Sequence, residues 1–368
     1  SVFVHNRLTH SLEVSSVGRS LGADVAALLQ QRDSAAGERT PEALGAIVSA
    51  ACLAHDMGNP PFGHSGERAI RSFFAEGQGR EWEKMLPKSV WADIVNFDGN
   101  ANTFRLLTHQ FNGHRAGGFV MTYATLAAIV KYPFASDCCR GKSKFGFFQS
   151  EAADFRRIAD ELGLPSCAAS DESLRFARHP LVYLVEAADD ICYQIMDIED
   201  AHKLRLLTSE EAIGLLLGFF EGRRLNDIRQ TMAMVDDTNE QIAYLRSCII
   251  GLLVDECTRV FIENEERLLD GSFDAPLIDR INEQARQAYK ACSEVAYRKI
   301  YVANEVVDVE LAGYRIFGYL LETVIDAVLH PEHAYSQLLL RRVPGQYDIK
   351  ASTTYGKIQC ALDYISGM

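Results

Sequence analysis

The sequence predicts an all-α protein with a helical core and further helices toward its C-terminus. Three observations predict this class: apolar residues recur at helical spacing along most of the chain, prolines and Gly-Pro turns bound these runs, and alternating patterns are rare. Only residues 144–148 and 343–349 offer short strand candidates. The 368 residues are 48% hydrophobic and 24% charged, the composition of a folded chain with a sizeable core.

The first helices surround a turn rich in glycine and proline. Apolar residues recur at helical spacing over residues 12–29 and again over 44–54. The second helix has to end near Gly58-Asn59-Pro60-Pro61, because two prolines cannot continue it. We expect the next helix to carry His64 and Glu67 on one face, since they are three positions apart.

The rest of the chain is also predicted to be helical. A capping-box pattern, Thr208 to Glu211, opens one of these helices. Further helical segments are expected at residues 119–131, 181–201, 209–217, 228–268 and 305–330. We expect one helical region over residues 1–205 and a second, C-terminal helical region over 206–368.

Net charge weighs against one class of protein, and the length of the apolar runs weighs against another. Lys and Arg number 37 against 50 Asp and Glu, so the net charge is −13, unlike a protein that binds nucleic acid over a broad basic surface. No stretch approaches the roughly 20 apolar residues of a membrane span. Nine scattered cysteines with no CxxC pair favour reduced thiols and a cytoplasmic location.

His55 and Asp56 end an apolar helix directly before the Gly-Pro turn. An imidazole nitrogen and a carboxylate oxygen at one helix end suit a divalent metal such as Mn²⁺, Fe²⁺ or Mg²⁺. A lone His-Asp pair is common by chance, but this one is followed by His64 and Glu67. A carboxylate that orients an imidazole is the arrangement of acid–base catalysis.

Two other segments place polar groups on helices that are otherwise apolar. Arg7 and His10 lie three positions apart and share one face. Asp189, Tyr193 and Asp197 form one stripe at four-residue spacing, among apolar neighbours that indicate a buried helix. Buried carboxylates need a metal, a cation or a hydrogen-bonding ligand to offset the loss of hydration.

Together these motifs resemble the deoxyguanosine triphosphate triphosphohydrolase family within the HD phosphohydrolase superfamily. The pattern of His10, then His55-Asp56, then Asp189 is similar to that of the superfamily. The run HDMGNPPFGHSGE over residues 55–67 and EAADDICY over 186–193 are specific to the narrower family. The resemblance covers nearly the whole chain. It implies an HD-domain phosphohydrolase core within residues 1–205 and a C-terminal helical region, 206–368, that would complete the nucleotide pocket and make oligomer contacts.

The resemblance implies roles for individual residues. His10, His55, Asp56 and Asp189 would be metal ligands, and His64 with Glu67 would be the catalytic pair. Arg7, Asn100, Tyr193 and Asp197 would bind the substrate. Arg7 would contact a phosphate, Asp197 the 3′-hydroxyl, and Tyr193 the sugar, where its ring would exclude a ribose 2′-hydroxyl.

The implied reaction is metal-dependent hydrolysis of dGTP, or of several dNTPs, to deoxynucleoside and tripolyphosphate, in control of dNTP pools. Mn²⁺ or Mg²⁺ would be the metal, with Fe²⁺, Co²⁺ and Ni²⁺ as alternatives. His64 would either activate water or protonate the departing 5′-oxygen. The resemblance also implies a homo-oligomer, such as a hexamer, with single-stranded DNA or a dNTP as candidate effector.

Two other readings compete with this one. Another HD-superfamily phosphohydrolase would release a monophosphate, a diphosphate or orthophosphate in place of tripolyphosphate. A regulator that binds nucleotide or single-stranded DNA without turnover would keep the metal ligands. The acidic composition and the His64–Glu67 pair weigh against the regulator.

Overall fold

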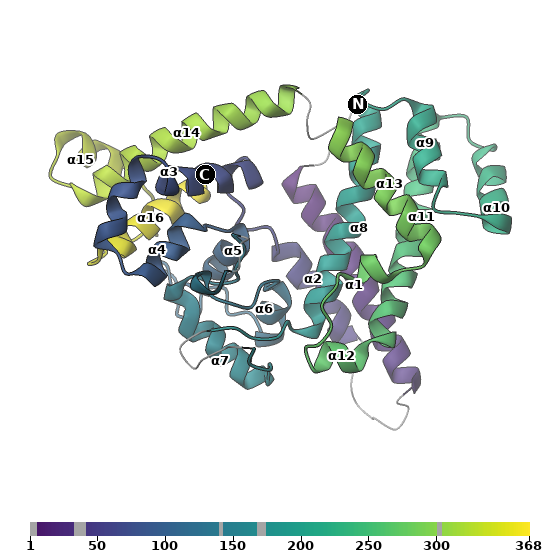
Figure 1. Ribbon diagram of the computed structural model, residues 1–368, viewed down its shortest axis with the longest axis horizontal. Helices are drawn as coiled ribbons and strands as arrows, with labels where there is room; N and C mark the ends of the chain where they lie inside the picture. The colour runs from purple at the N-terminus through teal and green to yellow at the C-terminus, as the bar shows by residue number, and fades with distance from the viewer. Residues whose placement is uncertain (1–5, 33–41, 140–142, 168–173, 300–303) are drawn as a thin grey trace. The chain divides into compact units, whose positions relative to one another are not determined.

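The computed structural model describes residues 6–32, 42–139, 143–167, 174–299 and 304–368, which form helices joined by turns and loops (Figure 1). The all-α prediction is confirmed, because no strand occurs within these residues. The two strand candidates are therefore wrong: Phe147 of the first candidate forms only an isolated bridge with Ala135, and residues 343–349 form turns and loop. The first candidate is rich in aromatic residues because Phe145, Phe147 and Phe148 enter the core. Among the described helices, none is both long enough and apolar enough to cross a membrane.

The chain forms two compact units, each made of two stretches of sequence. The first unit comprises residues 1–54 and 179–304, and the second comprises residues 55–178 and 305–368. These units are defined by internal packing. The division expected at residue 205 concerns function and not packing, and it stays a prediction.

The first unit is a bundle of long helices. Its helices are α1 (Arg7–Arg32), α2 (Glu42–Ala54), α8 (Pro180–Lys203), α9 (Ser209–Leu217), α10 (Gly222–Met232), α11 (Thr238–Glu263), α12 (Glu265–Leu269), the 3₁₀ turn η4 (Leu277–Arg280) and α13 (Glu283–Lys299). The capping box predicted for α9 is present at Thr208 and Glu211. The segment 228–268, expected as one or two helices, holds the end of α10 and all of α11 and α12.

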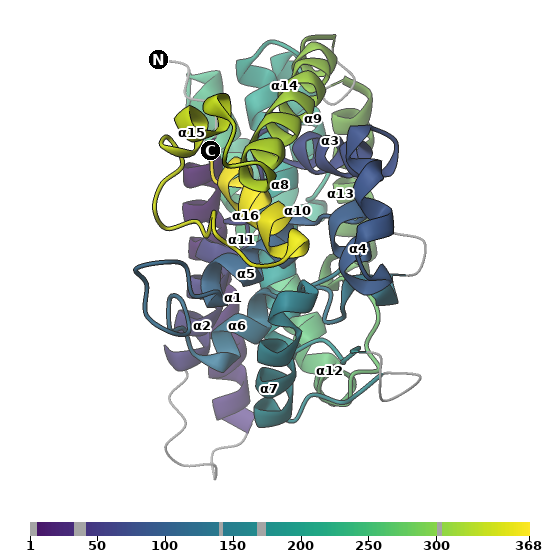
Figure 2. The same cartoon turned by 90° about the vertical axis from the view of Figure 1, so that its left-hand side faces the viewer.

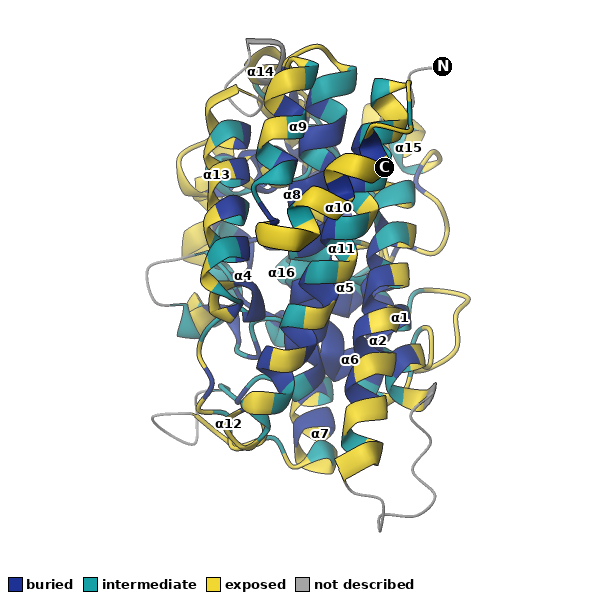
Figure 3. Ribbon diagram, turned by 90° about the vertical axis from the view of Figure 1, so that its right-hand side faces the viewer, coloured by how far each residue is buried: buried dark blue, intermediate teal, exposed yellow. Residues whose placement is uncertain are grey.

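Helices α1 and α2 pack closely against each other. The buried residues of α1 include Val14, Val17, Leu21 and Val25, which keep the predicted helical spacing. A Cβ atom at Gly22 would lie 2.8 Å from the carbonyl oxygen of Leu44, so glycine permits this approach. Figure 3 shows buried and exposed bands following one another along α1.

Helix α8 is the central element of the first unit, since it packs against α1, α2, α9, α11 and α13. Its start is fixed locally: Pro180 occupies the first turn, and the Leu181 N–H donates to Nδ1 of His179 at 3.2 Å. Most of its residues are buried, as predicted from its apolar neighbours.

The second unit contains shorter helices around an aromatic core. They are α3 (His64–Ala75), η1 (Gln78–Met85), α4 (Lys88–Val95), α5 (Gly99–Thr108), α6 (Tyr123–Ile129), η2 (Ser136–Cys138), η3 (Gln149–Glu151), α7 (Ala152–Leu162), α14 (Asn304–Leu329), α15 (Ala334–Leu340) and α16 (Thr354–Ser366). The core joins Phe74 of α3, Phe317 of α14 and Ile358 of α16, all buried (Figure 2). Helix α6 is shorter than the predicted 119–131. None of the nine cysteines, all of which lie within the described residues, forms a disulfide.

Candidate active site

The turn after α2 is fastened to α5 of the second unit. Thr103 donates its hydroxyl to the carbonyl oxygen of His55 at 3.0 Å, and the Gly58 N–H donates to the same hydroxyl at 2.9 Å. A Cβ atom at Gly58 would lie 2.0 Å from the Thr103 nitrogen, so no larger residue fits there. The backbone of the His55-Asp56 segment is therefore held in one place.

His55 and Asp56 present a nitrogen and an oxygen close together. Nε2 of His55 lies 3.5 Å from Oδ1 of Asp56, and these side chains are 11% and 29% exposed. Nδ2 of Asn59 donates to Oδ1 of Asp56 at 2.7 Å. The partly buried pair thus offers the donor atoms that sequence analysis expected at this helix end.

His64 is the first residue of α3. The preceding residues, Phe62 and Gly63, have positive φ angles of 64° and 55°, which bring the chain sharply into the helix. Nδ1 of His64 lies 3.2 Å from Oε2 of Glu67, so the predicted contact across one helical turn is present. The His64 side chain is 72% exposed, whereas that of Glu67 is 1% exposed.

Glu67 is a buried carboxylate with several partners. Oε1 accepts a hydrogen bond from the Gly99 N–H at 2.7 Å, and Oε2 lies 3.3 Å from Nζ of Lys144. Burial by itself would raise the pKa of this carboxyl, but the bonds from His64 and Gly99 and the charge of Lys144 lower it to about 2. Glu67 is therefore ionised at neutral pH and fixes one nitrogen of His64.

Asn100 lies in the first turn of α5, next to the buried residue Asp98. Its backbone N–H and its Nδ2 donate to Oδ1 of Asp98 at 2.8 and 2.7 Å. A Cβ atom at Gly99 would lie 2.0 Å from Oδ1 of Asn59, so glycine is required between these two residues. The structure thus places Asn100 beside the network that holds Glu67.

The remaining predicted residues lie in the first unit. Asn6 caps α1, because its Oδ1 accepts from the Thr9 N–H at 3.1 Å. This cap sets the first turn, which carries Arg7 and His10. Nε2 of His10 lies 3.0 Å from Oδ1 of Asp189 on α8, across 179 residues of sequence.

The polar stripe on α8 is the less buried side of that helix. Asp189 and Asp197 are partly exposed and Tyr193 is 49% exposed, while Ile191, Cys192 and most neighbouring residues are buried. The rings of Tyr193 and His10 meet edge to face with centroids 6.5 Å apart. The stripe predicted from four-residue spacing is therefore present as a surface feature of the first unit.

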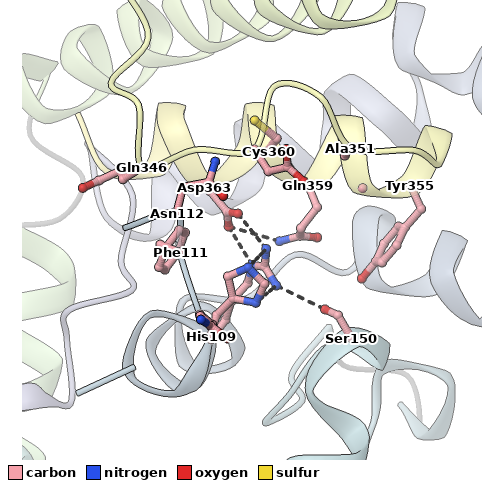
Figure 4. Close-up of a pocket in the computed structure, with 14 residues that line it drawn as sticks. His109, Phe111, Asn112, Ser150, Gln346, Ala351, Tyr355, Gln359, Cys360 and Asp363 are labelled. Carbon is pink, nitrogen blue, oxygen red and sulfur yellow. Dashed lines mark hydrogen bonds and ion pairs between the residues drawn. The ribbon is translucent and has the colours of Figure 1, made fainter. Parts of the chain in front are cut away.

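The second unit contains a cavity of about 290 Å³. Figure 4 shows it between His109, Ser150 and the residues of α16. Arg105 lines it and forms ion pairs with Glu151 at 2.5 Å and with Asp363 at 2.7 Å. None of the predicted site residues lines this cavity. The guanidinium of Arg105 is already paired with two carboxylates, so we assign the cavity to the structural core of the second unit.

Sequence analysis missed Lys144 as a specific contact of the site. Lys144 and Glu67 are 77 residues apart, so no helical spacing relates them. The only local signal is position: Lys144 directly precedes the buried Phe145, and Asp98 directly precedes α5. A charged residue at the edge of a buried aromatic run is a weak indication that its side chain returns toward the core.

Two pairs of residues, one within each unit, have donor atoms of the kind that a divalent metal prefers. His10 with Asp189, and His55 with Asp56, each pair an imidazole nitrogen with a carboxylate oxygen about as far apart as two ligands of one ion. Nitrogen with hard oxygen donors suits Mn²⁺, Fe²⁺ or Mg²⁺ better than thiolate-preferring ions. The donor atoms of each pair therefore fit such an ion.

Comparison with known proteins identifies the class. The HD domain family model matches residues 7–96, the segment that holds His10, His55-Asp56 and His64. HD domains are metal-dependent, in agreement with the donor chemistry.

Curated relatives extend the match over most of the chain. A protein of Pseudomonas aeruginosa (strain LESB58), named deoxyguanosinetriphosphate triphosphohydrolase-like protein, is 40% identical over 334 residues, which cover 89% of this chain and 73% of the relative. A protein of the same name from Synechocystis is 36% identical, with 99% and 83% covered. The deoxyguanosinetriphosphate triphosphohydrolase of Yersinia pestis (strain Pestoides F) is 29% identical, with 94% and 75% covered. The chain belongs to the deoxyguanosinetriphosphate triphosphohydrolase-like family.

Proposed function

We propose that this protein hydrolyses dGTP, or several dNTPs, to deoxynucleoside and inorganic tripolyphosphate, and so acts on dNTP pools. The observation that carries the proposal is the His64–Glu67 pair, an exposed imidazole with one nitrogen held by a buried, ionised carboxylate. Membership of the family and the names of its relatives support dGTP or other dNTPs as the substrate class.

His64 is the proton-transfer group in this proposal. Glu67 engages Nδ1, so Nε2 is the atom at which a proton is taken from water or given to the departing 5′-oxygen. Either role breaks the bond between the α-phosphorus and the 5′-oxygen, which releases the three phosphates as one chain. The 72% exposure of the His64 side chain leaves it accessible to a substrate.

His10, His55, Asp56 and Asp189 are the proposed metal ligands. A divalent ion bound there would supply Lewis acidity toward the α-phosphate. Arg7 and Asn100 would orient the phosphates, and Tyr193 with Asp197 would hold the deoxyribose. The identity of the metal, a homo-oligomeric state, an effector and a cytoplasmic location are further predictions from the family resemblance.

A product assay tests the proposal. Purified protein is stripped of metal, resupplied with Mn²⁺ or Mg²⁺, and incubated with each of the four dNTPs and with GTP. Deoxynucleoside with tripolyphosphate supports the proposal and defines the specificity. Monophosphate, diphosphate or orthophosphate would assign another phosphohydrolase activity. Nucleotide binding without turnover under all conditions would favour the regulator.

A further inference from the structure

Lys144 lies between two buried carboxylates of the second unit. Its Nζ is 3.3 Å from Oε2 of Glu67 and 3.4 Å from Oδ2 of Asp98. The side chains of Glu67 and Asp98 are 1% and 0% exposed, while that of Lys144 is 28% exposed. Two carboxylates that share one buried region cannot both stay ionised without a nearby cation.

The charged groups around Glu67 indicate that its ionisation depends on Lys144. His64 contacts Glu67 at 3.2 Å from α3, and Arg71 of the same helix lies 3.9 Å from Oε2. Asp98 opposes ionisation of Glu67 from the segment before α5. Lys144 is the cation at hydrogen-bonding distance from Oε2, and it also contacts the opposing carboxylate.

The position of Lys144 is fixed by its neighbours in the chain. Phe145 is fully buried in the core of the second unit. The Sγ–H of Cys139 donates to the carbonyl oxygen of Lys144 at 3.3 Å, and the Gly146 N–H donates to that of Phe134 at 3.0 Å. These contacts hold the backbone of Lys144 in place, so its ammonium group lies next to Glu67.

We propose that Lys144 is a positioning residue of the hydrolytic site: it bridges Glu67 and Asp98 and thereby keeps Glu67 ionised and directed at Nδ1 of His64. The inference rests on the proposed role of His64. Its physical basis is that a protonated Glu67 would no longer favour the imidazole orientation that leaves Nε2 toward the substrate. Burial raises the pKa of both carboxyls, and Lys144 opposes this effect at each of them.

The test compares Lys144→Met, Lys144→Arg and, as a control on the same unit, Lys84→Met at an exposed position. We expect Lys144→Met to lower kcat about tenfold to a hundredfold with little change in KM, as loss of outer partners typically does. The acid limb of the pH–kcat profile should move to higher pH, because Glu67 then protonates more readily. Lys144→Arg should restore most of the activity, and Lys84→Met should match the parent protein.

A second readout does not depend on turnover. The carboxyl carbon resonance of Glu67 in metal-free protein, assigned with Glu67→Gln, should titrate at higher pH in Lys144→Met than in the parent protein. If the parent protein lacks hydrolytic activity but this shift appears, the positioning contact stands and the proposed function fails. If the protein is active but neither kcat nor the Glu67 titration changes in Lys144→Met, the inference is overturned.

Two further outcomes are decisive. A rise in KM with unchanged kcat in Lys144→Met would assign Lys144 to substrate binding and contradict the positioning role. If Lys144→Met does not fold by circular dichroism, Asp98→Asn replaces it, since this variant leaves Lys144 to Glu67 alone. Glu67 should then titrate at the parent pH or lower. A higher titration point in folded Asp98→Asn would overturn the inference.

Discussion

Glu67 and His64 are in contact at 3.2 Å, although one side chain is 1% exposed and the other 72% exposed. The contact joins a group sealed in the core of the second unit to one that faces solvent. A buried carboxylate keeps its geometry because its bonds to Gly99 and Lys144 do not compete with water. The contact with Glu67 therefore holds the exposed imidazole in one orientation, which suits a group that contacts a substrate.

Replacement of His64 should abolish turnover without loss of metal. We expect His64→Ala to lower kcat for dGTP by about a hundredfold to ten-thousandfold, the usual contribution of a positioned acid or base. Metal content, measured by mass spectrometry of the dialysed protein, should stay at the parent value. The control is His114→Ala, at an exposed position of the second unit. Near-normal turnover by His64→Ala would refute its catalytic role.

Replacement of Asp189 should remove metal as well as activity. The Asp189→Asn variant keeps the size of the side chain but loses the charge that pairs with His10 at 3.0 Å. We expect reduced metal occupancy and a loss of turnover that added Mn²⁺ partly restores. Asp236→Asn, an equivalent change at an exposed position of the first unit, should alter neither quantity. Full metal content in Asp189→Asn would count against Asp189 as a ligand.

Tyr193 should control selection of the sugar. Its ring is 49% exposed on the polar stripe of α8, where it is available to a ligand. We expect Tyr193→Ala to raise kcat/KM for GTP relative to dGTP by about tenfold to a hundredfold, since a small steric group contributes about 1–3 kcal/mol to discrimination. Competition between the two nucleotides in one reaction measures the ratio directly. An unchanged ratio would show that the sugar is selected elsewhere.

Asp93 should make stability depend on pH near neutrality. It is completely buried, and burial raises its pKa to about 7, although Ser136, Tyr355 and the Gln149 N–H donate to it. The folded-state pKa exceeds the unfolded value of about 4. Its contribution to stability is therefore complete below pH 4 and is lost as the pH rises through 7.

Urea unfolding of the parent protein and of Asp93→Asn at several pH values measures this effect. Asparagine cannot ionise, so Asp93→Asn should not lose this stability as the pH rises. Its free energy of unfolding should therefore increase relative to that of the parent protein between pH 5 and pH 8. A difference between the two proteins that is independent of pH would show that Asp93 does not titrate in this range.

Local patterns in the sequence predicted the helices and the short-range contacts. The spacing of Val14, Val17 and Leu21 predicted α1, and the Thr208–Glu211 capping box predicted the start of α9. The His64–Glu67 contact was predictable because three residues of helix place both side chains on one face.

Contacts set by tertiary packing could not be predicted in the same way. Phe145 and its aromatic neighbours suggested a strand, since an apolar run fits a buried strand as well as a core loop. Lys144 reaches Glu67 only because the second unit folds two distant segments together. The burial of Asp93, which raises its pKa, likewise follows from the packing of four segments around it and has no local signature.

The most direct measurement of the reaction is hydrolysis of dGTP in water enriched in ¹⁸O, followed by mass spectrometry of both products. Cleavage between the α-phosphorus and the 5′-oxygen predicts one ¹⁸O atom in tripolyphosphate and none in deoxyguanosine. Incorporation of ¹⁸O into the 5′-hydroxyl of deoxyguanosine, or release of phosphate chains other than tripolyphosphate, would contradict the proposed reaction.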